Sequence, residues 1–508
     1  MIVRPSIPEV NVRTQFRAIG SGVTDRVFLV GITVWFFLQC IFLLSQERAA
    51  AIGAAYAAPA AAAMFVYAFA RVGLPRSAIA WLPPCLALWY ALTRALNGDY
   101  FLAESAPEVY ALFACCALFA AAFVGGPALR ARLLRAAALA YGLPMAAFAW
   151  IAVTAVVTGR PWIDPADTNN ILGVNWMYAS PYRLNFLGIH PNISAAYLYV
   201  ALALLIYLFF STRQPFLQSV YTAAGIGVYL AVVLAASNTA IAVTALMAGA
   251  TAYAAVTARN AGGKRRALTG LLAAAAAVCV VLASYPLLLN VLGAHGEQTW
   301  QESLAPTAAP SETAAPALSS PDPDAAALSA PQGAAVVYPR VDTAASSMKS
   351  RLIIYKSAFQ SVGERLLTLL IGELWDAAME RSARLIHIPV QYHLHNSFLQ
   401  LLVTGGVPAL LMAVAFAALL ALYGGRLFFG TGVPLNVRLL VLAPAALLCH
   451  GMLESLLFAD GRSPNLWFFL LAGAIVAYAS ELCPKRENAA AAASGEPAAG
   501  PSGARGAA

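Results

Sequence analysis

Charged side chains are scarce in this chain of 508 residues. Asp, Glu, Lys and Arg together make up 11% of it, against about 25% in soluble domains. Hydrophobic residues make up 61% of the chain and the mean hydropathy is +0.72. This composition excludes an ordinary soluble domain. It predicts an all-α integral membrane protein, because a helix satisfies its own backbone hydrogen bonds in lipid.

Cysteine and metal-binding patterns are also sparse. No CxxC or HExxH spacing occurs, so the sequence offers no case for a zinc site, and we expect neither a metal nor another cofactor. No cysteine falls in the long polar loops, which argues against a disulfide framework. The seven cysteines are Cys40, Cys85, Cys115, Cys116, Cys279, Cys449 and Cys483.

Long apolar runs dominate the chain. Each span needs about 20 residues to cross the hydrocarbon core, and the first run is a retained span because it starts well into the chain. We predict about twelve spans, at 28–45, 51–70, 77–97, 107–125, 134–158, 190–211, 218–236, 239–257, 267–293, 396–423, 437–458 and 465–482.

Basic residues fall in alternate loops, which sets the orientation of the chain. Lys and Arg are retained on the cytoplasmic side, and the basic loops include both ends of the chain. We therefore expect both termini in the cytoplasm and the segments 159–189 and 294–395 on the outer side. The net charge of +8 follows largely from this topology and calls for no nucleic-acid partner.

The large outer loop changes character along its length. Gly296 to Ser347 is rich in Ala, Pro, Ser and Thr without periodicity, which predicts a disordered insert. From Met348, apolar residues recur at three- and four-residue steps, which predicts an amphipathic helix at the outer membrane boundary. The apolar positions are Leu352, Tyr355, Phe359, Val362 and Leu366, opposite Lys349, Lys356, Gln360 and Glu364. A second short helix is expected over 372–385, before Pro389.

The predicted organisation has six parts, with one large periplasmic loop that contains short amphipathic helices. The parts are a cytoplasmic N-terminus (1–27), spans one to nine (28–293), a disordered insert (294–347), a helical segment with the candidate site (348–395), spans ten to twelve (396–482) and a disordered cytoplasmic tail (483–508).

Two histidines stand where the outer loop becomes a long apolar helix, in the run YHLHNSFLQLLVTGGVPA. A single histidine near a membrane surface is commonly an ordinary hydrogen-bonding group. His395 differs because it precedes Asn396, a good N-cap that can hold the helix start rigid. We therefore predict that His395 is catalytic and that His393 and Asn396 contact substrate.

Outer-side charges are the natural companions of His395. Arg351 opens the amphipathic helix and Arg183 lies directly before the sixth span. Arg94 and Glu454 lie near the outer ends of the third and eleventh predicted spans. Each could simply meet lipid headgroups. The sharper hypothesis is a substrate or pyrophosphate site, since a guanidinium is a planar fork of donors suited to phosphate.

These motifs together resemble the O-antigen ligase superfamily. The resemblance rests on HNSFLQLLVTGGVP after a large outer loop, on Arg351 followed by Tyr355, and on RxxxxGxHPN at Arg183 to Asn192. It implies a metal-independent glycosyltransferase of the bacterial inner membrane. Such an enzyme takes a glycan from an undecaprenyl-pyrophosphate carrier at the periplasmic face and passes it to a hydroxyl acceptor, in ligases lipid A-core. The resemblance also implies that His395 is the family histidine and that Arg351 is the loop arginine.

One departure and several alternatives remain. Where the family usually has a Ser-Arg pair, this chain reads Ser237-Asn238-Thr239. Either another cation such as Arg183 or Arg94 supplies that charge, or the carrier is held differently, or the chain is a divergent member with altered specificity. O-antigen ligase, polysaccharide polymerase and protein O-oligosaccharyltransferase share donor handling and are not separated by these motifs. A secondary transporter or lipid flippase would also have about twelve spans, with charges near the midplane rather than at the outer boundary.

Overall fold

A computed structural model gives the fold. It describes residues 30–31, 34, 78–99, 106–124, 126–158, 178–179, 183–184, 191–259, 263–304, 340–386, 394–458 and 463–483. The helices are α3 (Ala78–Leu96), α4 (Ala106–Val124), α5 (Pro127–Thr158), α6 (Pro191–Ser211), α7 (Pro215–Leu234), α8 (Asn238–Arg259), α9 (Gly263–Leu304), α10 (Arg340–Gly363), α11 (Leu366–Ile371), α12 (Trp375–Ile386), α13 (Ser397–Phe429), α14 (Leu435–Leu439), α15 (Leu442–Gly451) and α16 (Ser463–Leu482). A short antiparallel pair, β1 (Tyr178–Ala179) and β2 (Arg183–Leu184), precedes α6.

Eight of the described helices are long and apolar enough to cross a membrane: α3, α5, α6, α7, α8, α9, α13 and α16. The shorter apolar stretches 111–123 and 435–451 lie in α4 and in α14 with α15. These helices confirm the prediction of an all-helical membrane protein with several spans. The predicted number of about twelve stays a prediction. The predicted spans 28–45 and 51–70 lie outside the described residues, apart from three positions in the first.

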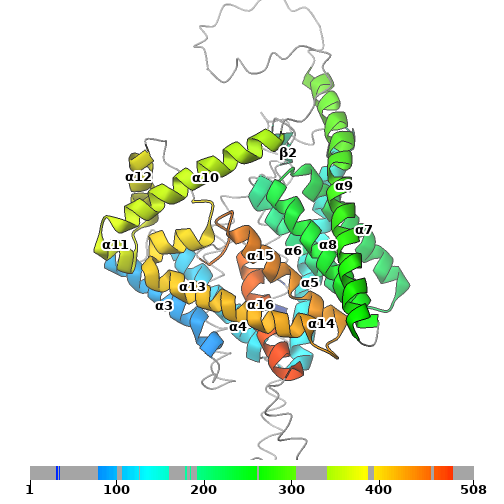
Figure 1. The fold of residues 1–508 in the computed structure, drawn as a ribbon, viewed down its shortest axis with the longest axis horizontal. Helices are drawn as coiled ribbons and strands as arrows, with labels where there is room; N and C mark the ends of the chain where they lie inside the picture. The colour runs from blue at the N-terminus through cyan, green and yellow to red at the C-terminus, as the bar shows by residue number, and fades with distance from the viewer. Residues whose placement is uncertain are drawn as a thin grey trace, which may run out of the picture.

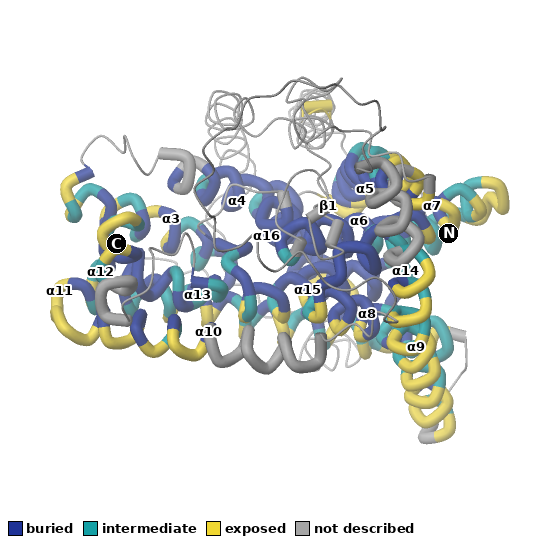
Figure 2. Tube along the Cα trace, turned by 90° about the horizontal axis from the view of Figure 1, so that it is seen from above, coloured by how far each residue is buried: buried dark blue, intermediate teal, exposed yellow. Residues whose placement is uncertain are grey.

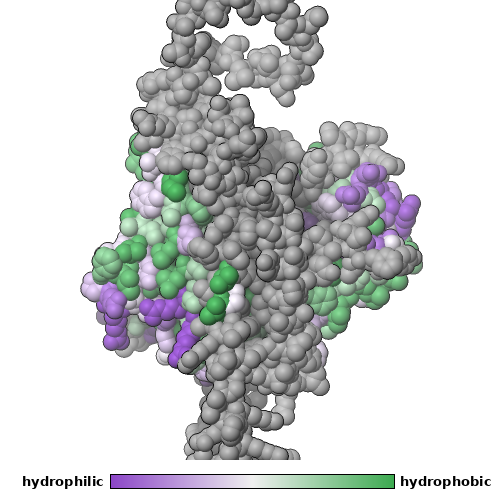
Figure 3. All heavy atoms as spheres, turned by 180° about the vertical axis from the view of Figure 1, so that it is seen from behind, coloured by the Kyte–Doolittle hydropathy of each residue, from purple (hydrophilic) through white to green (hydrophobic). Residues whose placement is uncertain are grey.

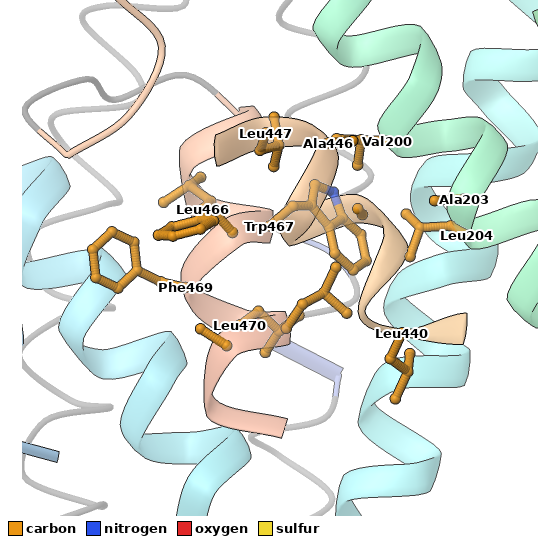
Figure 4. Close-up of a cluster of buried hydrophobic side chains, with 14 of the residues drawn as sticks. Val200, Ala203, Leu204, Leu440, Ala446, Leu447, Leu466, Trp467, Phe469 and Leu470 are labelled. Carbon is orange, nitrogen blue, oxygen red and sulfur yellow. The ribbon is translucent and has the colours of Figure 1, made fainter. Parts of the chain in front are cut away.

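The bundle is built around α16. Its residues are buried almost throughout (Figure 2). Trp467 on α16 lies against Ala446 and Leu447 of α15 and Val200 and Leu204 of α6 (Figure 4). Helices α13 and α4 also pack on α16, so the last span of the chain holds together elements from its first half and its end.

Helix α5 begins at Pro127 and not near 134, because its basic first turn is neutralised within the bundle. The buried Arg130 makes two hydrogen bonds with Glu481, of 2.8 and 3.0 Å, and a third with the carbonyl oxygen of Ala122 at 2.7 Å. A bidentate pair of this kind lets a guanidinium lie inside the protein. From the sequence alone, Arg130 and Arg132 indicate a loop, so the predicted start of the span is too late.

The predicted eleventh span, 437–458, is wrong over its last seven residues. Helix α15 ends at Gly451, and residues 452–458 form a non-helical turn that the side chains of neighbouring helices hold. The Ser397 hydroxyl accepts from the backbone amides of Leu456 and Leu457, at 2.9 and 3.0 Å. Glu454 therefore lies on a turn beyond the helix and not within a span.

Helices α9 and α10 extend into the range predicted as a disordered insert. Helix α9 continues to Leu304 and α10 begins at Arg340, while residues 305–339 lie outside the described part. Helix α10 runs across one side of the bundle towards α11 and α12 (Figure 1).

The predicted face of α10 needs a correction. Ile354, Ala358 and Val362 are buried against α12 and α13, whereas Leu352 and Phe359 are exposed beside Lys356. The small residues on the inner face, which include Ser357 and Ser361, permit close approach of the helices. Small residues such as these do not stand out in a pattern of large apolar residues, so the sequence predicts a different buried face.

The short helix predicted over 372–385 is α12, which begins at Trp375. A further helix, α11, precedes it and ends at Ile371, directly before Gly372. Gly372 has a φ of +68°, a conformation that favours glycine. The backbone amide of Glu373 then donates to the carbonyl oxygen of Val403 on α13, at 2.9 Å. The Glu373 carboxylate pairs with Arg381 at 2.5 Å and accepts from Thr368 at 3.0 Å.

Helix α13 has a kink at Gly406, where φ is +71°. The turn between α11 and α12 fits against this kink, because a Cβ atom at Gly406 would collide with the carbonyl of Leu370, and one at Gly372 with the backbone of Thr404. Trp89 of α3 donates to the carbonyl oxygen of Gly405 at 2.8 Å. The kink is thus a junction of α3, α11 and α13.

Candidate functional site

His395 is held in a defined backbone conformation directly before α13. Its φ of 52° lies in the left-handed region, which a residue other than glycine adopts only when its surroundings impose it. The next residue, Asn396, caps the helix: its side-chain oxygen accepts from the amides of Phe398 and Leu399, both at 3.0 Å. The Tyr355 hydroxyl of α10 donates to the carbonyl oxygen of His395 at 2.9 Å.

Glu454 is the centre of the site. Its carboxylate is 0% exposed and is contacted by side chains from three separate elements. Nδ1 of His395 lies 2.9 Å from one oxygen. Nη2 of Arg351 and Nδ2 of Asn192 each donate to the other oxygen at 2.8 Å. We refer to Glu454, His395, Arg351 and Asn192 as the Glu454 cluster.

The turn that carries Glu454 is tied to the start of α13. The Ser397 hydroxyl donates to the carbonyl oxygen of Glu454 at 2.9 Å. The side-chain amide of Asn396 donates to the carbonyl oxygen of Met452, also at 2.9 Å. Glu454 and His395 are therefore fixed relative to each other through backbone as well as side chains.

The charge on Glu454 follows from its partners. Burial raises the pKa of a carboxyl group, but here the hydrogen bond with His395 and the charges of His395 and Arg351 outweigh burial. Together they lower the pKa of Glu454 to about 2. The carboxylate is ionised throughout the physiological range. Burial also raises the pKa of Tyr355, so its hydroxyl remains a donor.

An ionised carboxylate can only accept hydrogen bonds, and this fixes the tautomer of His395. In the neutral imidazole the proton must lie on Nδ1, facing Glu454. Nε2 then carries the basic lone pair of the ring. The side chain is one-fifth exposed, so Nε2 belongs to a ring that outside molecules can reach. The arrangement is that of a general base oriented by a carboxylate.

The other predicted site residues are not part of the Glu454 cluster as the structure describes it. Arg183 lies in β2, but its side chain is outside the described part, as is all of His393. Arg94 is buried in the last turn of α3 with its guanidinium 4.7 Å from the ring centre of Tyr90. Its Nε and Nη2 atoms have no hydrogen-bond partner among the described residues. No contact in the described part joins Arg94 to the Glu454 cluster.

Two features of the site are not predicted from the sequence. Glu454 stays a predicted substrate contact, but its contacts with His395 and Arg351 come only from the structure. Asn192 stands in the HPN run, and the sequence assigns it no role of its own. A signal existed, because Asn192 follows the proline that starts α6 and comes from the same motif as Arg183.

The Ser237-Asn238-Thr239 segment begins α8. The backbone amide of Ala240 donates to the buried Ser237 hydroxyl at 3.3 Å, and the side chain of Asn238 is exposed. The serine therefore caps a helix, and the next residue supplies no cation. Among the described residues, no three His, Cys, Asp or Glu side chains gather as a metal ion would require.

Comparison with known proteins gives one match. Residues 225–414 match the model of the family described as O-Antigen ligase. No curated protein and no solved structure matches the chain. The matched segment runs from α7 into α13 and contains Arg351, Tyr355 and His395. Asn192 and Glu454, which complete the cluster, lie outside it.

Proposed function

Since the chain belongs to the O-antigen ligase superfamily through residues 225–414, we propose that it is a lipid-linked glycan transferase. The family consists of membrane enzymes that transfer glycans. We propose undecaprenyl pyrophosphate as the carrier of the donor glycan and lipid A-core as the hydroxyl acceptor. Transfer takes place at the periplasmic face of the bacterial inner membrane, with both termini in the cytoplasm. The proposed transfer reaction uses no metal ion.

The observation that carries the proposal is the contact between His395 and the buried, ionised Glu454. An acceptor hydroxyl at Nε2 loses its proton to His395 as its oxygen attacks the anomeric carbon of the donor sugar. The bond between that carbon and the pyrophosphate oxygen breaks. Its electron pair stays on the pyrophosphate, so the step is a single displacement.

Glu454 acts through His395 as a positioning and charge-stabilising residue. When Nε2 takes the proton, the imidazolium that forms lies 2.9 Å from a carboxylate, which stabilises it. Asn192 and Arg351 hold the second carboxylate oxygen at 2.8 Å. The carboxylate therefore does not need to rotate or exchange water during the reaction.

The leaving pyrophosphate needs fixed cations. Arg351 uses Nη2 for Glu454, and a guanidinium has five N–H donors, so the same side chain can face both the carboxylate and a phosphate. We assign Arg351 this role, with Arg183 and Arg94 as further pyrophosphate ligands and His393 and Asn396 as substrate contacts. Arg94 suits it because two of its buried nitrogens lack a partner among the described residues.

Other functions rank lower. A protein O-oligosaccharyltransferase or an O-antigen polymerase would use the same donor chemistry with another acceptor. A secondary transporter or flippase is disfavoured by the family match. It is also disfavoured because Glu454 lies on a turn that follows α15, and not at mid-depth of a span.

The deciding experiment is deletion of the gene in its host and comparison of the lipopolysaccharide by gel. We expect a core-only pattern that the wild-type gene restores and the His395→Ala gene does not. Immunoblots of the membrane fraction control for expression of the variant. An unchanged ladder in the deletion strain would exclude the ligase proposal and favour protein or capsule glycosylation, or transport.

A further inference from the structure

The exposed faces of the neighbouring helices α11 and α12 differ in chemistry. Helix α11 exposes Leu366, Leu367 and Leu370, which are 72, 65 and 48% exposed. Helix α12 exposes Asp376 and Glu380. Three exposed leucines in a helix of six residues are unfavourable in water, because apolar surface is stabilised when it is removed from water. No described part of the chain covers them.

The end of helix α11 lies next to the end of α3, one of the candidate membrane spans. The side chain of Asn97, just after α3, donates to the carbonyl oxygen of Gly372 at 3.3 Å, directly after α11. Helix α3 exposes its own leucines, Leu88, Leu92 and Leu96. Both helices that meet at this contact therefore expose leucines.

An exposed cation borders this apolar surface. Arg365 immediately precedes α11 and follows the exposed Glu364. A guanidinium at this position suits lipid phosphates. In Figure 3, the side of the molecule that carries α11 and α12 shows a hydrophilic group above a hydrophobic surface.

We propose that α11 is an interfacial anchor whose leucines insert among the acyl chains of the outer leaflet, with Arg365 at the level of the phosphates. Helix α12 faces water. The backbone of α11 packs against the kink of α13 at Gly406, and His395 lies just before α13. The anchor therefore fixes the height of His395 and Arg351 relative to the plane of the lipid phosphates.

The depth of α11 can be measured by electron paramagnetic resonance in lipid nanodiscs. A nitroxide is attached at Leu367→Cys, and for comparison at Ala377→Cys on α12, in a protein whose seven native cysteines are replaced. We expect frequent collisions with oxygen at position 367 and with a water-soluble nickel chelate at position 377. Equal access of the chelate to both sites would overturn the proposal.

A second measurement keeps the native cysteines, in case their replacement prevents folding. A photocrosslinking amino acid at position 367 in native membranes is expected to form adducts with phospholipid, and one at position 377 is not. A protein adduct at 367, to a second copy or to another protein, would overturn the proposal. Neither measurement depends on glycan transfer, so this anchor and the proposed function fail or stand separately.

Discussion

Glu454 is a negative charge that only its neighbours make tolerable. An ionised carboxylate removed from water is destabilised by several kcal/mol unless donors surround it. Here His395, Arg351 and Asn192 come from the start of α13, from α10 and from α6. Loss of any one partner leaves a buried charge less well compensated, so these residues serve the fold as well as the chemistry.

Removal of the imidazole tests its assignment as the general base. We expect His395→Ala to lower the transfer rate about 10²- to 10⁴-fold. Arg351 and Asn192 still hold the Glu454 carboxylate, so we expect the variant to fold, with a lower stability than the wild type. The check is single-turnover transfer with purified protein, with the exposed Lys356→Ala on α10 as the control. Wild-type turnover in His395→Ala would rule out the mechanism.

Removal of the charge at position 454 tests the carboxylate separately from its size. We expect Glu454→Gln to lower kcat about 10²- to 10⁴-fold, because the imidazolium loses its counter-charge and the tautomer is no longer fixed. The KM for the acceptor should change little. Glu454→Asp keeps the charge and should recover part of the rate. Equal losses in both variants would point to packing in place of charge.

The pH dependence of stability should reveal the same carboxylate. The folded-state pKa of Glu454 is about 2, against an ordinary value of 4.5. Since the folded carboxyl is the stronger acid, its contribution to the free energy of unfolding is fully present above pH 4.5 and disappears as the pH falls towards 2. Thermal unfolding in detergent should show wild type losing its advantage over Glu454→Gln across that interval. A constant difference between the two proteins would contradict this.

At the scale of elements, the kink of α13 joins α11 and α12 to the long apolar helix that follows His395. Gly406→Ala would place a Cβ atom against the Leu370 carbonyl at a φ of +71°. We expect a loss of about 1–3 kcal/mol from the conformation alone, measured as a lower unfolding temperature in detergent.

Gly425→Ala is the matched control in the same helix, because nothing lies within 4 Å of its added Cβ. It should be neutral or stabilising by up to about 1 kcal/mol. Similar destabilisation by both substitutions would show that the kink has no special requirement for glycine.

The sequence predicts the positions of the helices better than it predicts which side chains contact one another. Apolar runs of span length indicated α6 and α16 closely, because hydrophobicity alone sets such helices. The sequence did not predict the end of α15, because the hydroxyl of Ser397 and the side chain of Asn465 hold the turn that follows it. Those contacts come from distant parts of the chain and leave no local pattern.

The candidate site divides in the same way. His395 and Arg351 stand in motifs that can be read from the sequence. Their convergence on Glu454 spans 59 and 103 residues, and no periodicity or spacing reveals it. Asn192 is further still, at 262 residues from Glu454. Only the packing of α6, α10 and the start of α13 around one turn brings the four together.

At the scale of the whole molecule, the distribution of basic residues predicts which side each loop occupies. Alkaline phosphatase fused within 305–339 should be active, because that loop is expected in the periplasm. Fusions near residue 261 or after residue 483 should be inactive. Fluorescent-protein fusions at the same positions should give the opposite pattern. Activity at all three positions would contradict the topology and, with it, a periplasmic site.

The order of the Glu454 cluster along the chain bears on how the protein is made. Asn192, Arg351 and His395 all precede Glu454, which lies 59 residues after His395. While the chain is still being synthesised, the histidine and the arginine enter the membrane without the carboxylate that orients them. We expect a nascent or prematurely terminated chain to be inert towards its lipid substrates. Activity begins only when α15 and the turn after it have been inserted.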